Sequence, residues 1–377
     1  MTEERTELIG LTRAELATEM AAIGEKPLRT RQLWHWIYGR GATDFAAMTT
    51  LAKGLRERLA ERYVVGRPAI SRQQASDDNS RKWLVRFTDG NEAEAVFIPD
   101  DGRGALCMSS QVGCTLTCKF CHTGTQRLVR NLTAGEIVGQ MMVARDSYDE
   151  WPSTKENRLV SNVVMMGMGE PLFNYANVAK AVTILMDPDG IAISRRRITL
   201  STSGVVPMIR RCGADLGVNL AVSLHAVTDE VRSRLMPINN KYPIAELLAA
   251  CRDYPGAHNA RRITFEYIML KGINDSVADA RELARLVIGI PAKFNLIPFN
   301  PWPGTPYISS TPAAIKRFSR ILNDAGYSAP IRVPRGRDIL AACGQLRSDS
   351  QRPALIRLKA RLAAGIEDVP HPALVDG

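Results

Sequence analysis

The spacing of hydrophobic residues changes along this 377-residue chain, and each change marks a different kind of structure. Over residues 1–66 hydrophobic residues recur every three or four positions, which is typical of amphipathic helices. Residues 67–99 switch to alternation, with Lys82–Phe87 and Glu94–Ile98 flanking an Asp89-Gly90 turn. That alternation around a turn predicts a β-hairpin.

The first 66 residues are expected to form a small helical accessory domain. One helix begins after Thr12, a suitable N-cap, and a second covers Arg29–Tyr38. Thr43–Tyr63 is expected to supply one or two more helices. Trp34 and Trp36 are assigned to the core of this bundle, because large aromatic side chains are more often buried than free to stack on bases.

From about residue 104, strand-like apolar runs alternate with helix-like runs. The expected strands are Ala105–Ser110, Asn162–Met168, Ile198–Thr202, Asn219–Leu224, Thr264–Leu270 and Lys293–Pro298. Six strand–helix repeats predict a parallel α/β sheet. An open barrel fits better than a doubly wound sheet, although the pattern permits both. In either fold, active residues belong at the carboxyl ends of the strands.

The charge of the chain favours a polyanionic partner. Its formal net charge is +10, and between Thr311 and Arg361 eleven Lys and Arg residues face three acids. Further basic clusters occur at Arg195–Arg197 and at Arg127 and Arg130. Such clusters suit phosphate contacts, which give affinity without sequence choice. A basic enzyme without a nucleic-acid partner could have the same net charge, so the charge alone does not distinguish a nucleic-acid-binding protein from such an enzyme.

Other features of the sequence indicate the cellular compartment of the protein. No run of 18 apolar residues predicts a membrane span, and the charged start MTEERTELIG lacks the apolar segment of a secretory signal. We therefore expect a cytoplasmic protein without a membrane partner. Seven cysteines, an odd number with three close together, indicate metal or redox chemistry rather than a disulfide framework.

The clustered cysteines, Cys114, Cys118 and Cys121, follow the first expected barrel strand. Their CxxxCxxC spacing supplies three thiolates, so a bound metal or iron–sulfur cluster would keep one position open for a substrate or cofactor. Phe120 stands immediately before the third cysteine. The alternative is a structural zinc knuckle, with His122 or a distant cysteine as fourth ligand.

Polar or glycine-rich stretches also end the later strands. They are Met166–Pro171, Ser201–Gly204, Ser223–His225 and Asn300. Singly, each is compatible with an ordinary turn or cap, but five such sites, counting the cysteine loop, at five strand ends indicate a shared active site. Near the C-terminus, Cys343 is compatible with a small buried residue or with a nucleophile whose pKa is lowered by nearby arginines.

Taken together, these residues resemble the RlmN/Cfr family of radical S-adenosylmethionine (SAM) RNA methyltransferases. The resemblance rests on V-G-C-x3-C-x2-C at 112–121, R-N-L-T at 130–133, G-M-G-E-P at 167–171, S-L-H at 223–225 and A-C-G-Q at 342–345. It covers nearly the whole chain. The complete N-terminal region favours the RlmN branch, which methylates carbon 2 of adenine 2503 in 23S rRNA and of adenine 37 in tRNA. The Cfr branch, which methylates carbon 8 of the same rRNA adenine, is the nearest alternative.

The resemblance implies a partial (β/α)6 radical SAM barrel with an N-terminal helical accessory domain and a linking β-hairpin. The implied division is 1–66 for an RNA-binding accessory domain, 67–99 for the hairpin and 100–345 for the radical SAM core. Residues 346–377 would form a basic C-terminal helix and tail. A non-catalytic zinc protein that binds RNA is the alternative from a different class.

The family's site roles are carried over by position. Cys114, Cys118 and Cys121 would hold a 4Fe–4S cluster whose fourth iron binds SAM. SAM contacts are implied for Gly169, Glu170, Ser201, Ser223, Leu224, His225 and Asn300. Cys343 would carry the methyl group, and Cys107 would resolve the intermediate through a transient disulfide with Cys343. Glu94 would be the proton acceptor, although by pattern it is only a polar residue of the hairpin.

The chemistry of the base explains these implied roles. Carbon 2 of adenine is electron-poor and has no lone pair, so a direct displacement on SAM cannot methylate it. The family scheme therefore uses two SAM molecules, one to methylate Cys343 and one to generate the radical that activates the S-methyl group. An external reductant such as flavodoxin or ferredoxin is required. The implied partners are 23S rRNA and tRNA, and the protein is expected to be a monomer.

Overall fold

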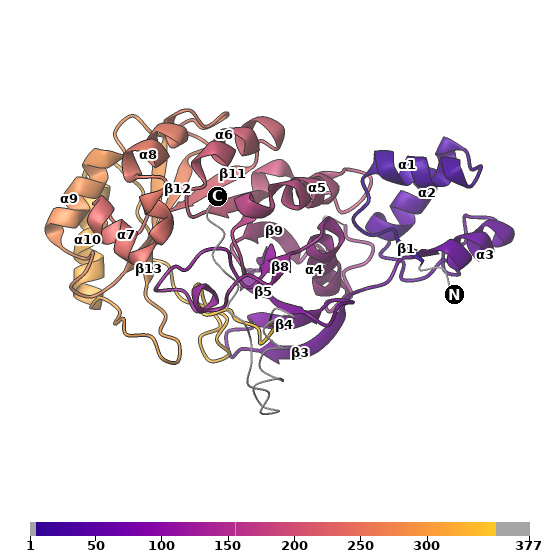
Figure 1. Ribbon diagram of the computed structural model, residues 1–377, viewed down its shortest axis with the longest axis horizontal. Helices are drawn as coiled ribbons and strands as arrows, with labels where there is room; N and C mark the ends of the chain where they lie inside the picture. The colour runs from indigo at the N-terminus through magenta and orange to yellow at the C-terminus, as the bar shows by residue number, and fades with distance from the viewer. Residues whose placement is uncertain (1–4, 155, 352–377) are drawn as a thin grey trace, which may run out of the picture.

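The computed structural model describes residues 5–154 and 156–351 (Figure 1). A helical N-terminal region lies at one end of a larger α/β body, and helices α9 and α10 lie at the other end (Figure 1). The basic helix and tail expected for 346–377 fall mostly outside the described residues. Within the described residues, no helix is long and apolar enough to cross a membrane.

The N-terminal region is closed by a short parallel strand pair, in which Thr6 and Glu7 pair with Tyr63 and Val64. Its elements are β1 (Thr6–Glu7), α1 (Arg13–Ala22), α2 (Pro27–Trp34), the π-helix η1 (His35–Gly39), α3 (Lys53–Arg62) and β2 (Tyr63–Val64). Thr12 caps α1 as predicted, because its hydroxyl accepts a hydrogen bond from the Glu15 amide. The burial of Trp34 in the core is also confirmed, whereas Trp36, assigned to the same core, is only partly buried against it.

Of the one or two helices expected over Thr43–Tyr63, one is present as α3, and the chain forms turns before it begins at Lys53. The Ala47 amide donates to the Asp44 carboxylate at 2.9 Å, and the Trp36 indole donates to the Thr50 hydroxyl at 2.7 Å. The Asp44 carboxylate thus offers a backbone amide a partner that competes with a helical backbone bond. The helical spacing of apolar residues here therefore reflects burial of turns.

The α/β body contains one nine-stranded sheet in the order β13-β12-β11-β10-β9-β6-β5-β4-β3. The strands are β3 (Ala69–Ala75), β4 (Arg81–Arg86), β5 (Glu92–Asp100), β6 (Arg103–Cys107), β9 (Val160–Met165), β10 (Ile198–Thr202), β11 (Asn219–Ser223), β12 (Ile263–Met269) and β13 (Ala292–Pro298). From β6 through β13 the neighbouring strands are parallel, which confirms the six-stranded parallel pattern.

The predicted hairpin is present as β4 and β5. It continues the barrel sheet, because β5 pairs antiparallel with β6 and Val96 lies opposite Cys107. A third antiparallel strand, β3, extends the same edge and was not predicted. Its side chains are almost all exposed, so the two-residue hydrophobic alternation that marks a half-buried strand is missing.

Helices follow the strands and lie outside the sheet (Figure 1). They are α4 (Ala134–Asp146), α5 (Tyr175–Met186), α6 (Val206–Asp215), α7 (Asp229–Leu235), α8 (Ile244–Arg252), α9 (Val277–Leu286) and α10 (Pro312–Asp324). The short elements are β7 (Gln111–Val112), η2 (Thr123–Thr125), β8 (Arg130–Asn131), η3 (Pro171–Asn174), η4 (Arg195–Arg197) and η5 (Pro237–Asn240). This order places every strand-ending motif at the same edge of the sheet.

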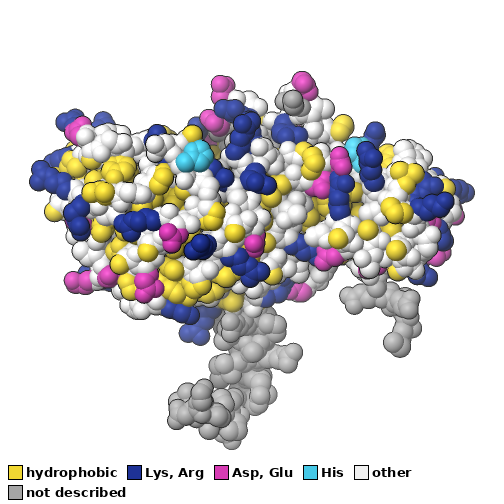
Figure 2. Space-filling model, turned by 90° about the horizontal axis from the view of Figure 1, so that it is seen from above, with side chains coloured by type: hydrophobic (Ala, Val, Ile, Leu, Met, Phe, Trp, Pro, Cys, Tyr) yellow, Lys and Arg dark blue, Asp and Glu magenta, His cyan; other side chains and the backbone are white. Residues whose placement is uncertain are grey.

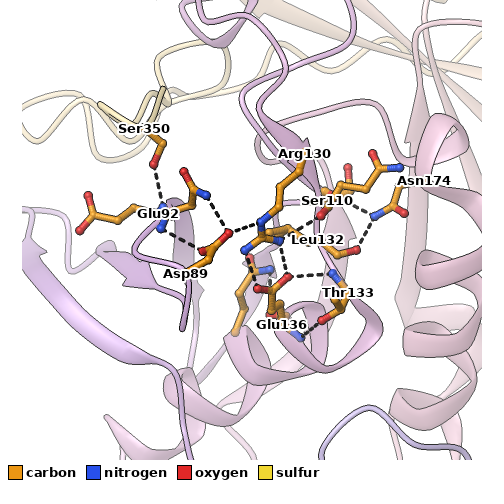
Figure 3. Close-up of polar contacts among 12 residues, drawn as sticks. Asp89, Glu92, Ser110, Arg130, Leu132, Thr133, Glu136, Asn174 and Ser350 are labelled. Atoms are coloured by element: carbon orange, nitrogen blue, oxygen red, sulfur yellow. Dashed lines mark hydrogen bonds and ion pairs between the residues drawn. The ribbon is translucent and has the colours of Figure 1, made fainter. Parts of the chain in front are cut away.

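The basic clusters differ in their relation to that edge. Arg195–Arg197 comes directly before β10 and therefore lies at the opposite, amino-terminal edge. Arg130 is already neutralised, because its guanidinium contacts Asp89 at 2.5 Å and Glu136 at 2.7 Å (Figure 3). The R-N-L-T stretch thus joins the hairpin turn to the start of α4. On the face seen in Figure 2, Lys and Arg side chains are scattered among acids over both parts of the molecule.

Candidate active site

The carboxyl ends of β9–β12 and the cysteine loop enclose one cavity. Nine of the residues implied by the resemblance line it: Cys114, Cys118, Cys121, Gly169, Glu170, Ser201, Ser223, His225 and Cys343. Residues that are far apart in the chain are therefore brought together as the parallel topology requires. Four other residues implied by the resemblance do not line this cavity: Leu224, Asn300, Cys107 and Glu94.

The cysteine loop is fixed by backbone contacts. The Cys121 amide donates to the Cys118 carbonyl at 3.2 Å, and the Lys119 amide donates to the Leu235 carbonyl of α7 at 2.9 Å. Gly124 closes the loop so tightly that a Cβ there would lie 2.4 Å from the Cys118 carbonyl oxygen. A larger residue at Gly124 would displace the loop, so this glycine is required for its shape.

The same loop holds the segment that carries Cys343. The His122 amide donates to the Gly344 carbonyl at 2.7 Å, and His122 Nδ1 lies 3.2 Å from the Gln345 carbonyl oxygen. The imidazole stacks on Trp302, and its Nε2 lies 3.2 Å from an Arg347 nitrogen. Both ring nitrogens are thus engaged within the protein, so His122 holds the Cys343 segment instead of serving as the fourth ligand of a zinc knuckle.

The three clustered thiols fit a metal cofactor that carries positive charge. Burial raises the pKa of each thiol, that of Cys114 to about 12, so ionisation requires a bound cation. Among the described residues, no set of three or more His, Cys, Asp or Glu side chains is grouped as ligands of one ion. Cysteines that hold a cluster bind different iron atoms, so they need not converge on a single point.

The G-M-G-E-P motif at 167–171 packs closely against the segment that precedes the cysteine loop. Gly169 has a φ of 95°, and a Cβ there would lie 2.5 Å from the Gln111 side chain. At Gly167 a Cβ would lie 2.7 Å from the Met108 backbone. The contacts that require glycine here are therefore with neighbouring protein segments. Glu170, the next residue of the motif, is buried. Its carboxylate accepts hydrogen bonds from the Ser203 amide at 2.7 Å and the Leu172 amide at 3.1 Å.

Asn300 provides an unsatisfied acceptor beside Cys343. Its Nδ2 donates to the Cys343 carbonyl at 3.3 Å, whereas its buried Oδ1 has no hydrogen-bond partner among the described residues. A buried acceptor without a partner is costly and is satisfied when a ligand supplies a donor. The amino group or a ribose hydroxyl of SAM has the required chemistry.

The Ser223–His225 stretch contributes both side chain and backbone. His225 has a φ of 60° and its Nδ1 accepts a hydrogen bond from the Ile268 amide at 3.1 Å. Burial lowers the pKa of His225 to about 3, so the imidazole is neutral at physiological pH. Leu224 is fully buried and donates its amide to the Glu266 carbonyl. Its side chain therefore does not line the cavity.

Cys107 and Glu94 lie behind the Cys343 segment. Cys107 ends β6 and is buried. Burial raises its pKa, and the charge of Cys343 adds to that effect. Glu94 Oε1 lies 2.8 Å from Lys82 Nζ, and its Oε2 accepts a hydrogen bond from the Arg347 amide at 2.9 Å. Burial raises the pKa of Glu94, although Lys82 opposes the effect.

The sequence pattern did not identify one buried acid that lines the cavity. Glu266 lies on β12, lines the cavity with Cys343 and accepts a hydrogen bond from Asn295 Nδ2 at 2.8 Å. Burial raises its pKa to about 7. The available signal was a single acid inside the otherwise apolar or β-branched run ITFEYIM. A charged residue in a buried strand is rare unless it is functional or paired.

We expect Glu266→Gln to stabilise the protein above pH 7. The unfolded carboxyl ionises near pH 4.5, whereas the buried one stays protonated until about pH 7, so native stability falls across this interval. Glutamine removes that loss while retaining an acceptor for Asn295. The gain should approach roughly 3 kcal/mol above pH 7 and vanish below pH 4.5. Urea unfolding from pH 4 to pH 8.5 measures it.

The matched control for this experiment is Glu246→Gln, on the exposed face of α8. It should leave the pH dependence of unfolding as it is in the parent protein. If Glu266→Gln also leaves that dependence unchanged, the carboxyl does not titrate near pH 7 in the folded state.

Comparison with known proteins identifies the family. The chain is 70% identical over 97% of its length to the dual-specificity RNA methyltransferase RlmN of Rhodospirillum rubrum, covering 86% of that protein. The chain belongs to the RlmN family. The RlmN of Paramagnetospirillum magneticum is 67% identical over 98% of the chain and 82% of its own length. Residues 6–65 match the ribosomal RNA large subunit methyltransferase N-terminal domain, and residues 108–286 match the radical SAM superfamily.

A solved structure supports the same assignment for the fold. A radical SAM methyltransferase from Sphaerobacter thermophilus superposes with a TM-score of 0.84 at 46% identity, over 91% of this chain and 99% of its own. The RlmN family member described here is thus a radical SAM RNA methyltransferase with the expected fold, whose family uses a 4Fe–4S cluster and SAM. The comparisons do not favour a non-catalytic zinc protein or a Cfr-type enzyme.

Proposed function

We propose that this enzyme methylates carbon 2 of adenine 2503 in 23S rRNA and of adenine 37 in tRNA, acting as a monomer in the cytoplasm. The observation that carries the proposal is the position of Cys343. Its residue is exposed, yet it lines the cavity that contains Cys114, Cys118 and Cys121. A methyl carrier needs both properties, because it must face the radical source on one side and the RNA base on the other.

The cofactors would be held by residues from several strand ends. Cys114, Cys118 and Cys121 would bind the 4Fe–4S cluster. SAM would contact Gly169, Glu170, Ser201, Ser223, Leu224, His225 and Asn300, with Leu224 contributing through its backbone. When bound and reduced by flavodoxin or ferredoxin, these cofactors supply methyl groups and a 5′-deoxyadenosyl radical. The protein excludes water from this chemistry by burying the cavity walls.

Three side chains would complete the transfer. Cys343 would present the methyl group to the base, and Cys107, at the end of β6, would release the product by forming a disulfide with it. Glu94 is proposed as the acceptor of the ring proton. Its link to the Arg347 amide ties its carboxylate to the segment that carries Cys343. The burial that raises the pKa of Glu94 would favour its protonated form after that step.

RNA binding is proposed for the basic rim around Cys343. Arg332, Arg335, Arg337 and Arg347 are exposed on the flanking segments. Their charges suit phosphate contacts, while the cavity would select an extruded adenine. We also propose that residues 1–66 form an accessory RNA-binding domain, that 67–99 form the connecting hairpin and that 100–345 form the catalytic core.

Metal content and nucleoside identity test the proposed function. Anaerobically purified protein should be brown, contain close to four irons and four sulfides per chain, and yield 2-methyladenosine in 23S rRNA and tRNA given SAM and reductant. Cys118→Ala is the matched control and should lose both iron and product. Colourless protein with zinc and no iron would refute the proposal, as would 8-methyladenosine as the sole product.

A further inference from the structure

Two arginine side chains in the α/β body are almost completely buried, but only one of them has a carboxylate as ion-pair partner within the described part of the chain. Arg145 is 1% exposed and lies 3.2 Å from the carboxylate of Glu150, which is itself buried. Arg232 is 0% exposed, and among the described residues no carboxylate lies within ion-pair distance of it. A guanidinium remains protonated in proteins, so the charge of Arg232 is buried without a paired anion.

The hydrogen bonds of Arg232 all go to neutral oxygens. Its Nη2 donates to the Ser203 and Ser223 carbonyls at 2.7 and 3.0 Å, and its Nε donates to the Leu224 carbonyl at 3.1 Å. Its Nη1 donates to Asn239 Oδ1 at 2.9 Å. These contacts satisfy the donors and brace the ends of β10 and β11. Carbonyl dipoles stabilise a buried charge only in part, so a counter-charge is still needed.

Asp229, which is linked to Arg232 through Asn239, does not supply that counter-charge by direct contact. Asp229 is exposed to water, and its carboxylate accepts hydrogen bonds from Asn239 Nδ2 and the Ile244 amide, both at 2.9 Å. Water screens its effect on a buried neighbour. The anion that compensates Arg232 must therefore come from the interior side.

The cysteine loop lies on that interior side. The Lys119 amide donates to the carbonyl of Leu235, three residues beyond Arg232 on the same helix. Burial lowers the pKa of Arg232 to about 10, and the charge of Cys118 is the largest effect in the opposite direction. Ser203, whose carbonyl accepts a hydrogen bond from the Arg232 guanidinium, lines the same cavity as Cys118. The guanidinium thus stands directly behind the cavity wall that holds the sulfur of Cys118.

We propose that Arg232 is the buried counter-cation of the cluster. This inference rests on the proposed function, since it requires thiolate-bound iron at Cys118. The positive charge offsets the negative charge of the three thiolates and favours uptake of one electron from the external donor. It therefore raises the reduction potential of the cluster. Arg232 touches no substrate and is a positioning residue that also sets the local potential.

The test compares Arg232→Gln and Arg232→Lys with Arg145→Gln in the full-length cluster-containing enzyme. The midpoint potential is measured without SAM by dithionite titration, with the EPR signal of the reduced cluster as readout. Arg232→Gln should lower the reduced-to-oxidised ratio at a fixed potential by about tenfold, a shift of ~59 mV for a one-electron couple. Arg232→Lys retains the charge and should stay near the parent value, and Arg145→Gln should not change it.

An unshifted potential in Arg232→Gln, with parental iron content, would overturn the inference but leave the proposed function intact. Absence of iron from the parent protein would instead overturn the proposed function. If Arg232→Gln assembles no cluster, urea unfolding of the iron-free proteins provides a second test. Without the cluster, Arg232→Gln should lose less stability than Arg145→Gln, which strands the buried Glu150. If Arg232→Gln lost as much stability as Arg145→Gln or more, the charge of Arg232 would not be uncompensated in the iron-free protein.

Discussion

Replacing Cys343 with alanine is expected to abolish methylation of RNA while the iron and sulfide content stays at the parental level. The sulfur is the proposed site of methyl attachment, and no neighbouring atom can take its place. The segment itself should remain in position, because the contacts from His122 to Gly344 and from Asn300 to Cys343 involve backbone oxygens. Product formation below detection, measured by nucleoside mass spectrometry, is the expected result.

The matched control for Cys343→Ala is Cys212→Ala. Cys212 is buried on α6, has no proposed role and lies 4.0 Å from the Tyr254 hydroxyl. Its replacement should leave turnover within about twofold, even if the lost packing reduces stability by ~1 kcal/mol. Turnover retained by Cys343→Ala would remove that cysteine from the mechanism.

Replacing Cys107 with alanine should have a second large effect of a different kind. The methyl carrier would still attach to the base, but the thiol that breaks the bond between Cys343 and the RNA would be missing. We therefore expect a covalent protein–RNA adduct to accumulate, with multiple turnover lost. A denaturing gel with labelled RNA, followed by mass spectrometry of the nuclease-treated protein, measures the adduct.

Two further variants decide whether Cys107 acts as proposed. Cys107→Ala combined with Cys343→Ala should give no adduct, because the attachment point is absent. The alanine itself should fit, since Cys107 is a β-strand residue packed between Val96 and Val164 of the neighbouring strands. Release of free methylated RNA at the parental rate by Cys107→Ala would exclude the resolving role.

Much of the secondary structure followed from local pattern. The strand at Ile198–Thr202 was predicted with the bounds found, and the strands on either side differ by only a few residues. Buried parallel strands are continuous apolar runs, and the helices between them have their own period. The pattern failed at the exposed strand β3, where it was weak. It left open whether one or two helices follow Thr43, and the turns between Asp44 and Thr50 reduce them to one.

The candidate site was recoverable from sequence only as far as its motifs are contiguous. CxxxCxxC and G-M-G-E-P stand out because several unusual residues occur within a few positions. Glu266 and Arg232 have no such neighbours, and the single acid in the apolar run of β12 is only a weak signal by itself. Their importance depends on burial and on the absence of a paired charge, which are properties of the folded chain.

The sequence by itself determined the parallel α/β pattern, the three-thiolate loop and, through its family motifs, the class of chemistry. The tertiary structure decided which charges are paired and which are not. Arg130 is held by Asp89 and Glu136, whereas Arg232 has only neutral oxygens around it. The physical reason is that periodicity is a local property of the chain. The partner of a buried charge, in contrast, comes from elements that only folding brings together.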